Sequence, residues 1–169
     1  MKKISIILVC LCLWTCNSSE KKVEEVVEEE VSPYLFKDAI SKLKYTDYTL
    51  DSDAQADIDS WDKYAELIFV ISKLKTGDMS YFLGDAKTIE VLMREILSNI
   101  PDAVNSPSIQ ARFVTLETKM LKLQSVLSMR NIPEEEQLQN IKETLIAYSN
   151  LNLQINKKYE KDSQNIQKP

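Results

Sequence analysis

The sequence predicts an all-α protein, an antiparallel up-down four-helix bundle with a short additional helix on its N-terminal side. Apolar residues recur at steps of three and four along most of the chain, which is typical of amphipathic helices. No segment alternates apolar and polar residues over a useful length, so no sheet is expected. Only two glycines, Gly77 and Gly84, occur among 169 residues, which favours long helices over tight turns.

The first two helices are predicted at residues 33–44 and 53–75. Ser32 is a cap residue, and Pro33 follows it at the first helical position. The second range has acidic residues in its first turns, which suits the helix dipole, and Gly77 just past its end. Its segment AELIFVI is apolar on nearly all sides, so we expect this helix to be central and contacted from several directions.

The connector between these helices, YTDYTLDSD, is predicted to pack its aromatic residues Tyr45 and Tyr48 on the domain, in preference to forming a ligand platform. The overlapping stretch DSDAQAD has closely spaced carboxylates. It lacks the central glycine and the closing glutamate of a calcium-binding loop, so no metal site is predicted there.

Two further helices are predicted at residues 79–99 and 108–130. Asp78 is a candidate N-cap of the first, and Gly84 in its opening turns leaves open a start at Asp85. In both ranges apolar residues step by 4, 3, 4, 3 and 4, the spacing of a bundle seam. They are Phe82, Ala86, Ile89, Met93, Ile96 and Ile100, followed by Ile109, Phe113, Leu116, Met120, Leu123 and Leu127.

The last helix is predicted from about Pro133 to Lys161, with three glutamates in its first turn and a disordered tail at 162–169. Long helices of this kind measure roughly 30 Å at 1.5 Å per residue. Because the loops between them are short, consecutive helices are expected to be antiparallel neighbours. The helical domain should therefore cover residues 33–161.

The N-terminal residues MKKISIILVCLCLWTC have the order of an export signal. Lys2 and Lys3 form a basic start, and an apolar run of eleven residues, 4–14, follows them. A membrane-spanning helix needs about 20 apolar residues, so this run is too short to cross a bilayer. We expect residues 1–15 to be a signal peptide that is removed.

The end of that run, LWTC, resembles the lipobox of bacterial lipoproteins, in which leucine or a similar residue lies three positions before a cysteine. Leu13 and Cys16 match the pattern, Thr15 is small, and Trp14 is bulkier than usual. The resemblance implies cleavage before Cys16, which becomes the first residue of the mature chain and carries a diacylglyceryl group and an N-acyl chain such as palmitate. It covers only these sixteen residues. The alternative is an ordinary secretory signal with an incidental cysteine.

The other cysteines fit the same interpretation. Cys10 and Cys12 lie inside the apolar run and act there as small hydrophobic residues. Cleavage before Cys16 leaves the mature domain without a free thiol, so it has no disulfide and no cysteine metal site. Two or more acyl chains, at about 0.8 kcal/mol per buried CH₂, anchor a protein stably. The expected location is the bacterial cell envelope, at the outer membrane, with the periplasmic or surface face left open.

Residues 16–32 are interpreted as the lipidated cysteine and an acidic, flexible tether. The segment NSSEKKVEEVVEEEVS is rich in glutamate and has no aromatic residue, and runs of like charge resist collapse. Two alternatives remain open. The acidic residues after Cys16 resemble the sorting signal of some surface lipoproteins, and Val23, Val27 and Val31 share one face of a short helix.

Composition excludes several classes of function. The chain has no histidine, which removes the usual general base near neutral pH and histidine-ligated zinc or haem. Two glycines cannot build a glycine-rich phosphate loop. Carboxylate pairs such as Asp59 with Asp62 lie at polar helix positions, as on a solvated face. The net charge of −5 disfavours nucleic acid as a partner. We therefore predict no enzyme activity, no cofactor and no metal site.

Arg94 and Arg112 lie beside the seam residues Met93 and Phe113, and they are predicted to form interhelical ion pairs or to contact a partner. The predicted function is a lipid-anchored, non-enzymatic protein-interaction or scaffolding module with an unknown protein partner. The alternative is a binder, sensor or inhibitor that holds a small molecule or peptide in the bundle core. A polar-lined pocket of about 300 Å³ or more favours the alternative, and a filled core with an exposed apolar groove favours the module.

Overall fold

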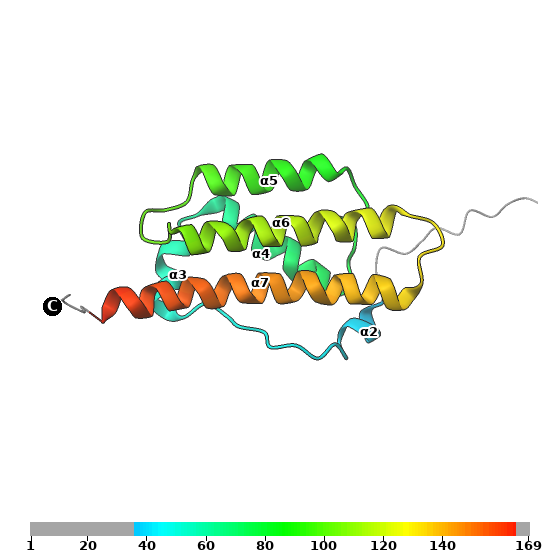
Figure 1. The fold of residues 1–169 in the computed structure, drawn as a ribbon, viewed down its shortest axis with the longest axis horizontal. Coiled ribbons are helices and arrows are strands. Elements are labelled where there is room, and N and C mark those ends of the chain that lie inside the picture. Colours follow the sequence, from blue (N-terminus) through cyan, green and yellow to red (C-terminus); the bar gives the residue numbers. More distant parts are fainter. Residues whose placement is uncertain (1–35, 165–169) are drawn as a thin grey trace, which may run out of the picture. The chain divides into compact units, whose positions relative to one another are not determined.

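A computed structural model of the chain describes residues 36–164 (Figure 1). Throughout this range the regular secondary structure is helical, which confirms the all-α class. The signal peptide, Cys16 and the tether lie outside the described residues. The described elements are α2 (Lys37–Ile40), α3 (Ser52–Ile58), α4 (Asp62–Lys75), α5 (Ala86–Ser98), α6 (Pro107–Ser128) and α7 (Glu134–Ser163).

The long helices pack around one apolar core. Helix α6 lies along α7 and α5 lies on α6, while α4 contacts both α5 and α7. In Figure 1, α6 and α7 run in opposite directions on either side of their short connection. Nine of the twelve seam residues predicted from the 4-3 spacing, including Met93, Phe113 and Met120, are fully buried, whereas Ala86, Ile100 and Leu127 are half-buried. None of the helices described between residues 36 and 164 has the length and apolar character needed to cross a membrane.

Helix α7 is the one contacted from several sides, so the prediction that residues 53–75 form the central helix is wrong. It packs against α2, α3, α4 and α6 along its 30 residues. On α4, Ala65 is exposed and Phe69 is 61% exposed. Hydropathy alone does not indicate the central position of α7 in the bundle, because the buried residues of this helix include polar ones. These are Asn140, Thr144, Ser149 and Asn152.

The predicted helix at 53–75 is two helices, because the chain leaves the helical path at residues 59–61. Ser60 Oγ donates to the Asp57 carbonyl (2.9 Å), a local bond that competes with helix continuation. Trp61 has non-helical backbone angles, and its ring enters the core, 5.1 Å from Tyr64 and 5.8 Å from Phe113 between centroids. Its indole Nε1 has no hydrogen-bond partner there, so ring contacts hold it in place.

The structure also fixes three other predicted boundaries. Helix α5 begins after Asp85, whose side chain accepts from the Lys87 amide (2.9 Å), so the start left open there is confirmed and Asp78 is not a helix cap. The predicted helix at 33–44 is only the four residues of α2 within the described range, because Phe36 has a left-handed backbone (φ 65°) that ends the helix on its N-terminal side. The last helix continues to Ser163, two residues into the predicted tail.

An extended segment joins α2 to α3 and lies along α7 (Figure 1). We call residues 46–51 the strap. The aromatic residues of this connector differ in their surroundings: Tyr45 packs partly against the core, whereas Tyr48 is 39% exposed. The prediction that both pack on the domain is therefore correct for Tyr45 alone.

Candidate functional site

The candidate site is a groove on the surface between α4 and α5. These helices are joined by residues 76–85, where a turn places Met79 and Phe82 in the core and leaves Tyr81 half-buried. Phe69 of α4 lines the same hollow as the turn residues Ser80 and Tyr81. This α4–α5 groove consists of two neighbouring hollows that both include Glu66 in their walls.

The larger hollow has a volume of about 610 Å³ and is open to solvent. Its surface is mostly apolar and is supplied chiefly by Phe69, Val70 and Tyr81. Lys73 and Asp78 lie at its edge, 3.7 Å apart between Nζ and the carboxylate. An exposed phenylalanine beside an apolar hollow is a feature of protein contact surfaces, since burying such a ring in a partner is favourable.

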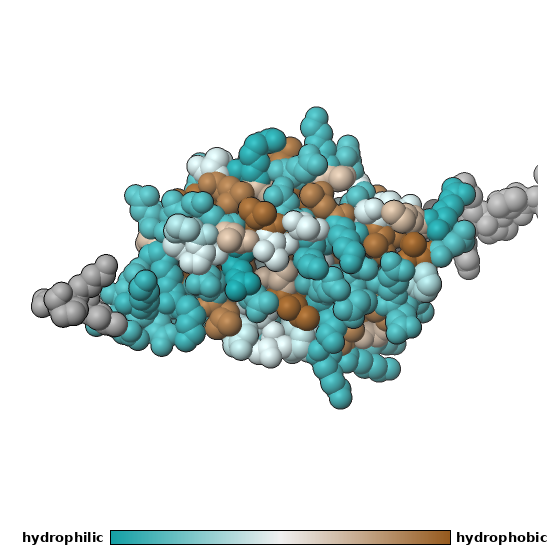
Figure 2. All heavy atoms as spheres, in the orientation of Figure 1, coloured by the Kyte–Doolittle hydropathy of each residue, from teal (hydrophilic) through white to brown (hydrophobic). Residues whose placement is uncertain are grey.

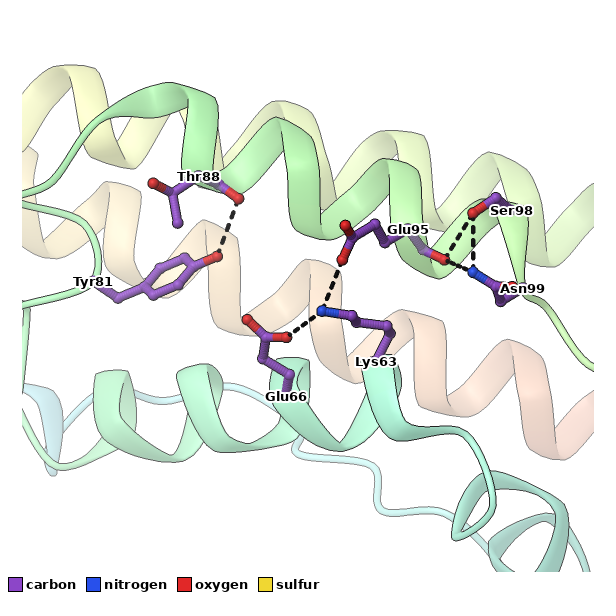
Figure 3. A network of polar contacts seen from close by, with 7 residues as sticks. All are labelled: Lys63, Glu66, Tyr81, Thr88, Glu95, Ser98 and Asn99. Carbon is purple, nitrogen blue, oxygen red and sulfur yellow. Dashed lines mark hydrogen bonds and ion pairs between the residues drawn. The ribbon is translucent and has the colours of Figure 1, made fainter.

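The smaller hollow, of about 360 Å³, also has a mostly apolar surface, and it is bridged by an ion-pair network (Figure 3). Lys63 Nζ of α4 lies 2.7 Å from Glu95 of α5 and 3.1 Å from Glu66. Nearby, the Tyr81 hydroxyl donates to the Thr88 carbonyl (3.4 Å). These contacts tie the turn and both helices together across the groove.

Several ionisable side chains of the groove have shifted pKa values. The hydrogen bond from Lys63 lowers the pKa of Glu95, and the same contact raises the pKa of Lys63. Bonds from the Ser80 hydroxyl and amide lower the pKa of Asp78. Burial, with a smaller effect of Glu66, raises the pKa of Tyr81 to about 12. At neutral pH the Lys63–Glu95 pair and Asp78 are therefore charged, and the Tyr81 phenol is protonated.

The Lys63–Glu95 pair is expected to make the stability of the fold depend on pH. Because the folded pKa of Glu95 is lowered, its contribution to stability is present above the usual carboxyl pKa of about 4.3 and is lost as pH falls through the lowered value. Glu95→Gln is expected to have a slightly lower Tm than the wild type at pH 7. The difference should disappear between about pH 5 and pH 2.

Thermal unfolding followed by circular dichroism across that pH range checks this expectation. Asp102→Asn is the control, since Asp102 lies in an exposed loop and makes none of the ion pairs described within residues 36–164. A Tm difference for Glu95→Gln that persists unchanged at low pH would contradict the ion-pair explanation.

A second polar cluster lies inside the fold, between α4, α7 and the strap. The Tyr64 hydroxyl donates to Asn152 Oδ1 (2.7 Å), and Asn152 Nδ2 donates to the Tyr48 carbonyl (2.9 Å). Burial raises the pKa of both Tyr64 and Tyr148. Tyr64 and Asn152 are thus bonded to each other and to the strap, which is typical of structural support.

The sequence did not single out Asn152 or the other polar residues of α7 that hold the strap. The available signal was the spacing of Ser149, Asn152 and Asn156, which places three small polar side chains on one face of a helix. Their partners lie about a hundred residues away, so the spacing alone does not reveal the contact.

The predicted site residues have the following positions. Cys16 lies outside the described residues. Arg94 and Arg112 are exposed, and neither forms an ion pair within residues 36–164, where the ion pairs all use lysine. A partner contact by the two arginines stays a prediction. The described part of the chain contains no cluster of three or more side chains able to hold a metal ion.

The face that carries α5, α6 and α7 offers no continuous apolar surface. Figure 2 shows its apolar side chains as separate spots among polar and charged ones. Scattered apolar residues such as Val114, 54% exposed on α6, are normal for a soluble surface.

Compared with protein-family models, with curated proteins and with solved structures, the chain shows no match to any of them.

Proposed function

We propose that the chain is a lipid-anchored, non-enzymatic protein-interaction module of the bacterial cell envelope, and that it binds its protein partner in the α4–α5 groove. The partner inserts an apolar side chain next to Phe69. The observation that carries this proposal is the 61% exposure of Phe69 beside a largely apolar hollow of about 610 Å³. A partner that covers the ring removes its apolar surface from water, at roughly 25 cal/mol per Å².

The anchoring half of the proposal rests on the resemblance of LWTC to a lipobox. In it, Cys16 carries the lipid that contacts the outer membrane, and residues 17–32 space the helical domain from the bilayer. The helical domain is proposed to be an antiparallel up-down four-helix bundle of α4, α5, α6 and α7. The contacts of α4 with α5, α5 with α6, α6 with α7 and α4 with α7 support this arrangement.

The alternative, a binder of small molecules or peptides in the bundle core, has less support. The polar groups inside the fold, Tyr64 and Asn152, are bonded to each other and to the strap. The hollows that are large enough for a ligand lie at the surface and are open.

Phe69→Glu is the test of the groove. A carboxylate at this position prevents burial of an apolar surface, so we expect recovery of the partner from detergent-solubilised envelope to fall at least tenfold. The measurement is a pull-down with the tagged full chain, with the recovered proteins identified and quantified by mass spectrometry. Thermal unfolding should be nearly unchanged, because the ring is exposed in the folded chain.

Val114→Glu is the matched control, since Val114 is similarly exposed on α6. It introduces the same charge away from the groove and should leave recovery of the partner unchanged. Equal loss in both variants would contradict a contact at Phe69. If no partner is recovered with the wild type and a small molecule raises its Tm, the alternative function takes precedence.

A further inference from the structure

The strap is held on α7 through its backbone. Ser149 Oγ accepts from the Tyr48 amide (2.8 Å) and donates to the Thr46 carbonyl (2.7 Å). Asn156 Nδ2 donates to the Thr49 carbonyl (2.8 Å), and its Oδ1 accepts from the Asp51 amide (3.0 Å). With the bond from Asn152 to Tyr48, polar side chains of one helix take the place that a neighbouring strand has in a sheet.

The side chains of the strap contribute little to its attachment. Residues 46–49 are exposed, and Leu50 packs only partly against the core. Asp47 forms an ion pair with Lys75 of α4 (2.6 Å), which lies at the surface and is screened by salt. Before the strap, Ile40 is buried, and Phe36, Leu43 and Tyr45 pack partly against the core. Residues 36–51 thus have one buried apolar side chain, whereas most of the buried core residues come from α4 to α7.

Segments with few buried apolar contacts and exposed hydrogen bonds open at lower free energy than the core. We propose that residues 36–51 detach from α7 as a unit while α4 to α7 stay folded, and that this detachment lengthens the tether between the membrane and the helical domain. The second part rests on the proposed lipid anchor at Cys16. The segment is placed for this role because it lies between the tether and the first residue of α3.

Detachment greatly increases the maximum distance between Cys16 and the helical domain. With residues 36–51 attached to α7, the chain between Cys16 and the domain comprises residues 16–35, which span at most about 70 Å when fully extended. Detachment extends this stretch to residue 51, and the maximum span rises to about 125 Å. The same anchored protein then has a short and a long state, and the long state lets the α4–α5 groove reach a partner farther from the membrane.

Hydrogen–deuterium exchange on the full chain tests detachment without any need for lipid. In the wild type, the amides of residues 46–51 are expected to exchange at least tenfold faster than the buried amides of α6 and α7. In Ser149→Ala/Asn156→Ala, which removes four of the strap's bonds, exchange in residues 36–51 should rise by a further tenfold or more. The exchange rates of α6 and α7 should not change.

The control is Asn150→Ala/Gln154→Ala, which changes two polar residues of α7 that make none of the strap's hydrogen bonds. It should exchange as the wild type does. If the hydrogen-bonded amides of Tyr48 and Asp51 in the wild type exchange in step with α6 and α7, the segment does not open on its own and the proposal is overturned. That comparison needs no variant, so it holds even if the double variant fails to fold.

The change in tether length is measured on the lipidated full chain in vesicles of neutral phospholipid. A donor dye is attached through Lys161→Cys near the end of α7, and an acceptor dye is carried by the lipid. The double variant should show lower energy transfer than the wild type and the control. Equal transfer in all three would overturn the two-length tether, whereas a wild type that does not bind vesicles would refute the lipid anchor and leave the exchange result to decide detachment.

Discussion

Phe113→Ala is expected to lower the free energy of unfolding by about 3–5 kcal/mol, because it removes the ring that joins α6 to the aromatic residues of α4. Phe113 is 0% exposed, and its ring centroid lies 5.8 Å from Trp61 and 6.1 Å from Tyr64. Truncation leaves a cavity in the centre of the core, and the two remaining rings lose their edge-on contacts. The measurement is urea unfolding followed by circular dichroism.

The neighbouring residue offers a control on the same helix. Val114 is 54% exposed, so Val114→Ala should change the free energy of unfolding by less than about 0.5 kcal/mol. If the two variants lose similar stability, Phe113 does not have the central position that the ring contacts indicate. The pair also tests the seam spacing of α6, which places residue 113 inward and residue 114 outward.

Cys16→Ser is expected to remove the protein from the membrane fraction, as either a soluble chain or an uncleaved precursor. In the proposed anchor the cysteine sulfur is the acceptor of the diacylglyceryl group. Its acyl chains supply about 0.8 kcal/mol per buried CH₂. Fractionation of cells, followed by mass measurement of the protein in each fraction, checks the result.

Cys12→Ser is the control for this variant. Cys12 lies in the apolar run and is interpreted as part of the removed signal, so the variant should be processed and retained at the membrane as the wild type is. Normal processing and full membrane retention of Cys16→Ser would refute the lipobox interpretation. A change in Cys12→Ser alone would indicate that acylation occurs at the earlier cysteine.

The helices that were predicted most accurately are those whose pattern is local and regular. Residues 107–128 and 134–163 form single helices close to the predicted ranges, since Ser106 and Pro133 mark their starts. The range 53–75 was predicted less well because apolar residues keep their helical spacing through the interruption at residues 59–61. Its interruption depends on Trp61, whose ring gains contacts with Tyr64 and Phe113 that no local window contains.

The candidate site was also predicted only in part. The sequence shows that Phe69 is apolar and lies on a helix, but its exposure and its place beside Ser80 and Tyr81 depend on how the turn packs against α4. Arg94 and Arg112 were correctly placed beside seam residues. Both side chains are exposed in the structure, and the ion pairs within residues 36–164 are made by lysines such as Lys63.

The sequence by itself determined that this protein is helical and which faces of α5 and α6 turn inward. These properties follow from residue type and spacing, which act over a few turns of helix. Only the tertiary structure decided that α7 is contacted from several sides, that Phe69 borders a groove, and that Ser149, Asn152 and Asn156 hold the strap. These properties depend on contacts between residues up to 107 positions apart, and periodicity shows which face of a helix is apolar without showing which neighbour covers it.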